Sequence, residues 1–253
     1  MLLDVLWDPP SAVFVFGSLL GIAFTASDKE QGLRLVNDLA LPIGLIGLVV
    51  GLVGTLQNVS DYDALPSSVA VAHLPLIYAL VAYGFTLVEI PAKTQFPNSY
   101  VRKFAGTTVF VLFVLWAVAA SSGFKVFFLI DGLVFIAVGI VFFVVVDRVL
   151  KRKNSSGWTI RLLGIALTCF ACALLGMLAN LDERRGIGPA AALALLGVFY
   201  ALVLVVIGRV VVPEKMLDAY GQNRTGVMAL VLPFLLGVFV LFALMDSATL
   251  YVK

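Results

Sequence analysis

The feature that most constrains this chain is an internal repeat: residues 42–93 recur without a gap, 122 positions later, as residues 164–215. Of the 52 aligned pairs, 16 are identical. An apolar composition raises the number of chance matches, but it does not explain polar and turn-forming identities at one fixed offset. Those identities include Asn58 with Asn180, Tyr78 with Tyr200, and Pro91 with Pro213. The repeat predicts two similar units, each a hydrophobic helix, a polar loop and a second hydrophobic helix.

The composition places these repeats in a membrane. Hydrophobic residues make up 62% of the 253 residues, charged residues make up 13%, and the mean hydropathy is +1.09. This leaves too little polar surface to cover a water-soluble globule. Helical spans need roughly 17 to 25 mostly apolar residues. Eight stretches approach or meet that length: 11–26, 39–57, 67–88, 105–121, 126–146, 160–181, 189–212 and 226–245. Because these runs are continuously apolar and not alternating, they favour an α-helical bundle over a β-barrel.

The predicted fold is an all-α integral membrane protein with about eight transmembrane helices in two four-helix repeats, at residues 1–123 and 124–253. Each repeat contains one recurring helix pair, at 39–88 and at 160–212. Four spans return the chain to the side where it started, so the repeats are predicted to be parallel. With the N-terminus outside, 13 Lys and Arg residues fall on the inner side and four on the outer side. This distribution predicts that both termini lie outside.

Small residues form a stripe on the first helix of each recurring pair. They are Gly44, Gly47, Gly51 and Gly54 in the first copy, and Ala166, Cys169, Ala173 and Gly176 in the second. Their spacing puts them on one helical face, which another helix can approach closely. Packing inside the bundle is favoured, and a central interface that lines a pore or holds a partner helix stays open. Packing is also favoured over redox chemistry for Cys169 and Cys172, because no βαβ pattern surrounds this C-x-x-C. Tyr78 and Tyr200 are predicted to brace helix packing through their hydroxyl groups.

Three ionisable residues are candidates for an ion or polar pathway: Asp8, His73 and Asp131. His73 is the only histidine and lies in a predicted span, where ionisable groups are functional candidates. A hydrogen bond to a loop is its simpler interpretation. Asp8 and Asp131 lie at the outer ends of two spans, where helix capping is favoured over an ion-attracting vestibule. The sequence has no metal-ligand spacing, phosphate-binding loop or nucleophile–base arrangement. We therefore expect no enzyme activity, metal, cofactor or nucleic-acid partner.

The first recurring pair reads Ile43-Gly-Leu-Ile-Gly-Leu-Val-Val-Gly-Leu52, followed by Leu56-Gln-Asn-Val-Ser-Asp61 and Pro91-Ala-Lys93. This pattern resembles the third and fourth transmembrane helices of the MotA/TolQ/ExbB proton-channel family, and it is closest to the MotA and PomA flagellar stator subunits. The second copy is similar. The resemblance implies several such subunits around the transmembrane helices of a MotB-, TolR- or ExbD-type partner, whose membrane carboxylate carries H⁺ or Na⁺.

The chain departs from the family pattern in three ways. The large cytoplasmic insertion of the family is replaced by the eleven residues 28–38, so torque on a rotor is not expected. Hydroxyl-bearing residues of the family are absent at the six matching positions, which are Leu48, Pro75, Leu76, Phe170, Gly197 and Val198. An apolar lining does not replace the hydration shell of an ion, so efficient conduction by the family's route is not expected. Whole duplicated chains also cannot form the family's five-membered ring, which predicts another closed assembly or mixing with other family members.

The leading hypothesis is a multi-pass protein of the bacterial inner membrane, embedded in lipid, that acts as a scaffold or channel-like component around a partner transmembrane helix. The partner is expected to be a further copy of the chain or a single-span MotB/ExbD-like protein. Two alternatives stay open. One is a small-solute or ion transporter whose parallel repeats move against each other, and the other is a structural membrane subunit without ion flux.

Overall fold

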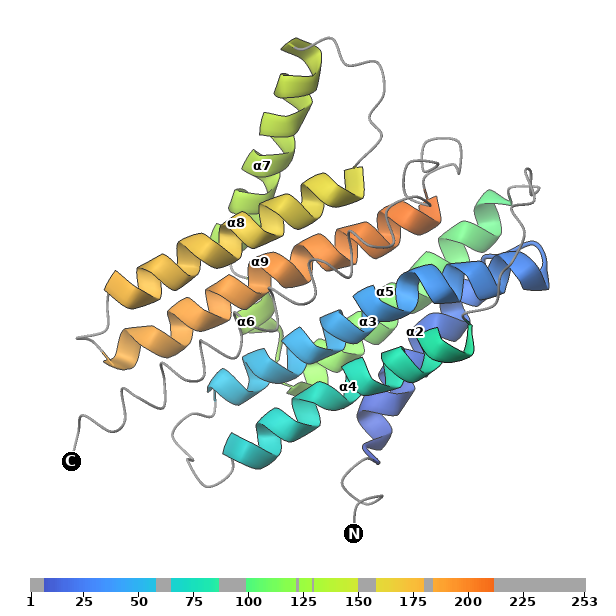
Figure 1. The fold of residues 1–253 in the computed structure, drawn as a ribbon, viewed down its shortest axis with the longest axis horizontal. Helices are drawn as coiled ribbons and strands as arrows, with labels where there is room; N and C mark the ends of the chain where they lie inside the picture. The colour runs from blue at the N-terminus through green and yellow to red at the C-terminus, as the bar shows by residue number, and fades with distance from the viewer. Residues whose placement is uncertain are drawn as a thin grey trace. The chain divides into compact units, whose positions relative to one another are not determined.

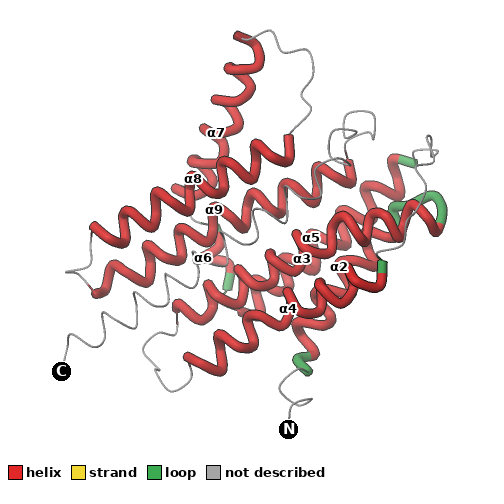
Figure 2. The backbone as a smooth tube through the Cα atoms, viewed as in Figure 1, coloured by secondary structure: helices red, strands yellow, loops and turns green. Residues whose placement is uncertain are grey.

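A computed structural model describes residues 7–57, 65–86, 99–121, 123–128, 130–149, 158–179 and 184–211. These residues are helical and contain no strand (Figures 1 and 2). The helices are α2 (Pro9–Ala23), α3 (Lys29–Gln57), α4 (Leu65–Phe85), α5 (Tyr100–Ser121), α6 (Phe124–Phe127), α7 (Ile130–Val149), α8 (Trp158–Ala179) and α9 (Arg184–Val211).

Five segments of the described residues are long and apolar enough to cross a membrane: Lys29–Leu56, Ser67–Phe85, Tyr100–Ser121, Phe124–Val146 and Ala194–Val211. The prediction of an all-α membrane protein is therefore confirmed. These segments correspond to five of the eight predicted spans.

The other three predicted spans are not among these five segments. The first, 11–26, is α2, which has only 15 residues. At a rise of about 1.5 Å per residue, α2 extends about 22 Å, which is less than the roughly 30 Å of a bilayer core. The sixth, 160–181, forms α8, and the eighth, 226–245, lies outside the described residues. The total of eight spans and the outer position of both termini stay predictions.

The described helices fall into two compact units. Unit 1 contains α2 to α6 and residues 202–211 of α9, and unit 2 contains α7, α8 and the earlier part of α9. These units do not coincide with the sequence repeats at 1–123 and 124–253, because the end of α9 belongs with unit 1.

Residues 28–38, which we predicted to connect two spans, require a correction. Helix α3 begins at Lys29, so nearly all of this stretch is helical. The Oδ1 atom of Asp28 accepts a hydrogen bond from the backbone N–H of Gln31 at 2.8 Å, and Gln31 Oε1 accepts one from the backbone N–H of Ser27 at 2.7 Å. This exchange resembles a capping box. The capping signal was present in the sequence, but the predicted span followed the apolar run, which begins only at residue 39.

Helix α3 is the central helix of unit 1 and packs against α2, α4 and α5 (Figure 1). Its side chains are buried in all directions; Ile43, Ile46 and Leu48 are each 0% exposed. A helix that is hydrophobic on all sides is stable only where other helices or lipid surround it. Here the neighbouring helices of unit 1 cover α3.

Helix α4 covers the small-residue stripe of α3. The stripe residues Gly44, Gly47 and Gly51 face Ala79, Pro75 and Ala72 of α4, respectively. A Cβ atom added to Gly51 would lie 2.7 Å from the Cα atom of Ala72, which is closer than real Cβ contacts allow. The two backbones therefore approach each other at a distance that only small residues permit.

In the second recurring pair, within unit 2, helices α8 and α9 also approach closely at the equivalent position. Cys169 of α8 faces Gly197 of α9, and a Cβ atom added to Gly197 would lie 2.7 Å from the Cβ atom of Cys169. These residues are the repeat partners of Gly47 and Pro75. In the first pair the glycine lies on the first helix, and in the second pair it lies on the second helix. The smaller residue of the contact is therefore on the first helix in one copy and on the second helix in the other.

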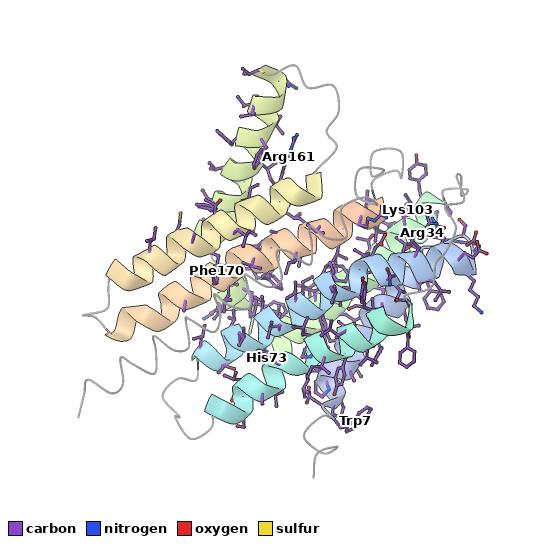
Figure 3. All side chains as sticks on the ribbon, in the orientation of Figure 1. Trp7, Arg34, His73, Lys103, Arg161 and Phe170 are labelled. Carbon is purple, nitrogen blue, oxygen red and sulfur yellow. The ribbon has the colours of Figure 1, made fainter. Side chains whose placement is uncertain are left out.

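Unit 2 also pairs α7 with α8. The guanidinium group of Arg161 on α8 lies 5.8 Å from the ring centroid of Phe143 on α7 (Figure 3), within the range of a cation–π interaction. The other faces of α7 carry exposed apolar side chains such as Val138 and Phe142, each 62% exposed. Such a helix is suited to contact with lipid.

Replacing Gly51 with alanine is expected to lower the free energy of unfolding by about 1–3 kcal/mol, because the added methyl group meets the backbone of Ala72. The control is Gly84→Ala in α4, where no described atom lies within 4 Å of the added Cβ. It is expected to leave stability unchanged or to raise it slightly. Thermal unfolding in detergent, followed by circular dichroism, compares the two variants. Equal midpoints would contradict the close contact.

Candidate functional site

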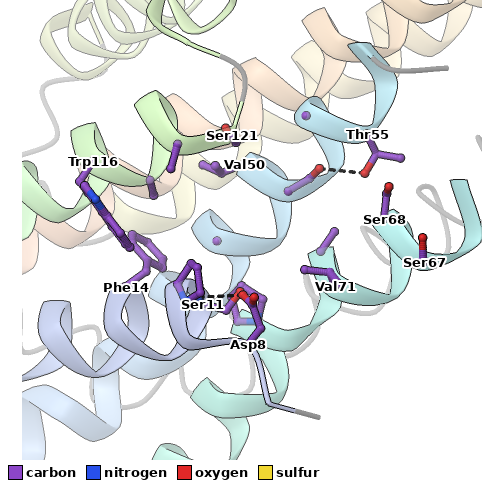
Figure 4. Close-up of a pocket in the computed structure, with 18 residues that line it drawn as sticks. Asp8, Ser11, Phe14, Val50, Thr55, Ser67, Ser68, Val71, Trp116 and Ser121 are labelled. Atoms are coloured by element: carbon purple, nitrogen blue, oxygen red, sulfur yellow. Dashed lines mark hydrogen bonds between the residues drawn. The ribbon is translucent and has the colours of Figure 1, made fainter. Parts of the chain in front are cut away.

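A cavity of about 440 Å³, here named the α2–α5 cavity, lies among four helices of unit 1 (Figure 4). It is lined by the first turns of α2 and α4 and by the last turns of α3 and α5. The short length of α2 explains the space. The backbone N–H of Asp8, directly before α2, donates a hydrogen bond to the hydroxyl of Tyr78 at 2.9 Å. Because Tyr78 lies in the second half of α4, α2 begins beside that half of α4 and does not run along its first half.

The lining combines polar and aromatic side chains. Six of the lining residues carry a carboxylate or a hydroxyl: Asp8, Ser11, Thr55, Ser67, Ser68 and Ser121. Two aromatic residues, Phe14 and Trp116, also line the cavity. In Figure 4, Thr55, Ser67 and Ser68 gather on one side, whereas Phe14 and Trp116 lie on the other. No lysine, arginine or histidine is among the described lining residues.

Asp8 has two roles in the described structure. Its Oδ2 atom accepts a hydrogen bond from the backbone N–H of Ser11 at 2.9 Å, which caps the N-terminus of α2. The same side chain lines the α2–α5 cavity. The sequence offered capping and an ion-attracting vestibule as alternatives, but the position of Asp8 is compatible with both.

The hydroxyl groups of the cavity were missed by the sequence analysis, which considered only the positions that match the family's hydroxyls. Thr55 lies one turn after Gly51, and its Oγ1 donates to the carbonyl oxygen of Gly51 at 3.0 Å. Ser121 Oγ donates to the carbonyl oxygen of Val118 at 3.2 Å. A threonine directly after the last glycine of the stripe, Gly54, was the available signal.

The other two ionisable candidates do not line the cavity. His73, labelled on α4 in Figure 3, is half-buried, and its Nδ1 donates to the backbone carbonyl of Val69, one turn earlier, at 2.7 Å. Asp131 is the second residue of α7 in unit 2, and its side chain lies outside the described part of the structure. Asp8 and His73 are thus separate sites within unit 1.

The remaining candidates for helix packing lie in several environments. Gly54 lines the α2–α5 cavity, as do Gly47 and Gly51. The ring of Tyr78 lies 6.0 Å from that of Phe16, and the buried Tyr200 lies with its ring 5.6 Å from that of Phe199. In α8, Ala166 and Cys169 are buried, Cys172 is exposed, and only the backbone positions of Ala173 and Gly176 are described.

A buried ion pair in unit 1 was also missed. Arg209 Nη2 donates to Asp38 Oδ2 at 2.6 Å, and the two side chains are only 11% and 7% exposed. From the sequence, Arg209 was counted as one charge of the inner surface. Beside this pair, Asn37 Nδ2 donates to Thr86 Oγ1 at 3.2 Å and joins α3 to the end of α4. A carboxylate directly before the long apolar run that begins at Leu39 was the signal for the ion pair.

No protein-family model, curated protein or solved structure matches the chain. The resemblance to MotA/TolQ/ExbB subunits stays a prediction from the sequence.

Substituting leucine for either Asp38 or Arg209 alone is expected to lower the free energy of unfolding by about 3 kcal/mol or more, because the partner charge stays buried. The double variant is expected to lose less than the sum, since no isolated charge remains. Arg102→Leu, at an exposed position of α5, is the control, with a change of about 0.5 kcal/mol or less. Unfolding curves in detergent measure all four proteins. Strictly additive losses would rule out the coupling.

Proposed function

We propose that this chain is a multi-pass protein of the bacterial inner membrane that acts as a scaffold around a partner transmembrane helix. In this proposal it is a duplicated and shortened relative of MotA/TolQ/ExbB subunits. The observation that carries the proposal is a close helix–helix contact that occurs at the same position of both recurring pairs. It joins Gly47 to Pro75 in the first pair and Cys169 to Gly197 in the second. The two copies have different side chains at this contact and still keep the two helices close.

The buried ion pair supports the parallel arrangement of the two repeats in this proposal. Asp38 lies in the early part of α3, and Arg209 lies near the end of α9. The predicted topology places both residues at the inner side of the membrane. An Nη2–Oδ2 distance of 2.6 Å brings the ends of the two side chains together, as is expected when two parallel repeats have both residues near the inner side.

The scaffold proposal also specifies which surface meets the partner. Because α2, α4 and α5 cover α3, the glycine stripe of α3 is not available to another helix. Within the first recurring pair, α4 has an exposed apolar face that includes Ile77, Leu80 and Val81. We therefore assign the partner contact to this face of α4. Membrane lipid is the competing occupant.

Cysteine cross-linking tests this assignment. In a variant in which Cys169 and Cys172 are replaced by alanine, a single cysteine at Leu80 of α4 is compared with one at Leu112 of α5; the two leucines are 47% and 59% exposed. After labelling of the cysteine with benzophenone-4-maleimide and irradiation in native membranes, we expect Leu80→Cys to form a defined product with a second copy or a single-span protein, because the excited ketone inserts into C–H bonds and needs no thiol on the partner. Leu112→Cys is expected to form none. Products of equal yield from both positions, or no product from either, would reject the assigned face.

The second candidate function is a small-solute or ion transporter, which the polar lining of the α2–α5 cavity favours. Proteoliposomes distinguish the two. The scaffold proposal predicts H⁺ and Na⁺ flux equal to that of protein-free vesicles, because the matching positions of the family's hydroxyls are apolar. Flux above that background that weakens in Asp8→Asn or His73→Leu would favour the transporter.

A further inference from the structure

The geometry points to the α2–α5 cavity as a binding site for a small organic cation, a primary ammonium group attached to an apolar body. The inference concerns the ligand of this cavity, and it goes beyond the scaffold proposal. It rests on the charge of the lining, the direction of its hydrogen bonds and the aromatic residues of its wall.

The charge of the lining favours a cation. Asp8 is the one charged residue among the described lining residues, and no basic side chain accompanies it. Its cap to the backbone N–H of Ser11 uses one lone pair of a carboxylate that has about four acceptor positions. An ammonium group at Asp8 would form a charge-assisted hydrogen bond, which is about twice as strong as a neutral one.

The hydroxyl groups strengthen this preference. Thr55 and Ser121 donate their protons to carbonyl groups of their own helices, so the oxygen atom of Thr55 can act as an acceptor for a donor in the cavity. An ammonium group has three donors and no acceptor, which suits such a lining. Both residues also lie in the last turns of α3 and α5, where the negative ends of the helix dipoles attract cations. The first turns of α2 and α4, which also line the cavity, act in the opposite direction, so the helix dipoles balance and an anion belongs in the test.

The opposite wall suits an apolar body. Phe14 and Trp116 lie beside each other there (Figure 4), and Val50, Val71 and Pro75 add apolar surface elsewhere in the lining. Aromatic faces also attract cations. The volume of about 440 Å³ is that of a small-molecule site. A phenylalkylamine matches this combination, with its ring on Phe14 and Trp116 and its ammonium group at Asp8.

Isothermal titration of the full chain in dodecyl maltoside tests the assignment with 2-phenylethylammonium. The neutral 2-phenylethanol and the anion 3-phenylpropionate are the matched ligands. We expect the cation to bind at least about tenfold more tightly than either, since hydrogen bonds to charged groups contribute that much. Equal affinity for the three ligands, or tighter binding of the anion, would overturn the inference.

Two capping carboxylates provide matched variants. Asp8→Asn removes the charge while asparagine still caps α2, so the fold is retained. Asp28→Asn makes the same change at the cap of α3, away from the cavity. We expect Asp8→Asn to weaken binding of the cation about tenfold or more and Asp28→Asn to change it less than about twofold. Equal effects of the two variants would also overturn the inference.

The ammonium group has two possible sources, a free amine or the headgroup of an ethanolamine lipid. Short-chain phosphatidylethanolamine and phosphatidylglycerol are therefore added as competitors. Displacement by phosphatidylethanolamine alone supports the inference with a lipid as the source, and displacement by neither supports it with a free amine. Displacement by phosphatidylglycerol alone would contradict it. These measurements use the isolated chain, so their outcome is separate from that of the cross-linking test of the scaffold.

Discussion

The close contact between α3 and α4 is the interaction on which the rest of unit 1 depends. Glycines at positions 44, 47 and 51 let the backbone of α4 lie against α3, and the other neighbours of α3 then complete its cover. In a membrane, helices gain little from burying apolar surface against each other, because lipid is equally apolar. Close packing must supply the stability instead, and only small residues permit it. The α3 stripe is therefore the geometric basis of unit 1 and is unavailable as a partner surface.

The α2–α5 cavity follows from the same packing. Helices α3, α4 and α5 are long, whereas α2 is short and begins beside the second half of α4. The first turns of α2 and α4 and the last turns of α3 and α5 border a partly open space. Its lining gathers a carboxylate and several hydroxyls that lie far apart in the sequence. A polar site thus arises at the end of an otherwise apolar bundle, without a dedicated motif.

The sequence predicted the parts of the structure that depend on periodicity and composition. The all-α membrane class followed from long apolar runs, and the spacing of the glycines predicted one packing face on α3. The sequence did not reveal relations between distant residues, such as the ion pair of Asp38 with Arg209, 171 positions apart. It also gave the wrong start for α3, because the apolar run begins at residue 39 whereas the hydrogen bond between Asp28 and Gln31 caps the helix ten residues earlier. The hydroxyls of the cavity were missed because attention to matching family positions excluded Thr55 and Ser121.

The central claim is that this chain holds transmembrane helices together. The most direct measurement is native mass spectrometry of the protein released from membranes with its bound components. The account predicts a fixed assembly in which the chain is bound to further copies of itself or to a single-span protein in a constant ratio. A single copy of the chain that carries only lipid, under conditions that preserve known membrane complexes in the same sample, would contradict it.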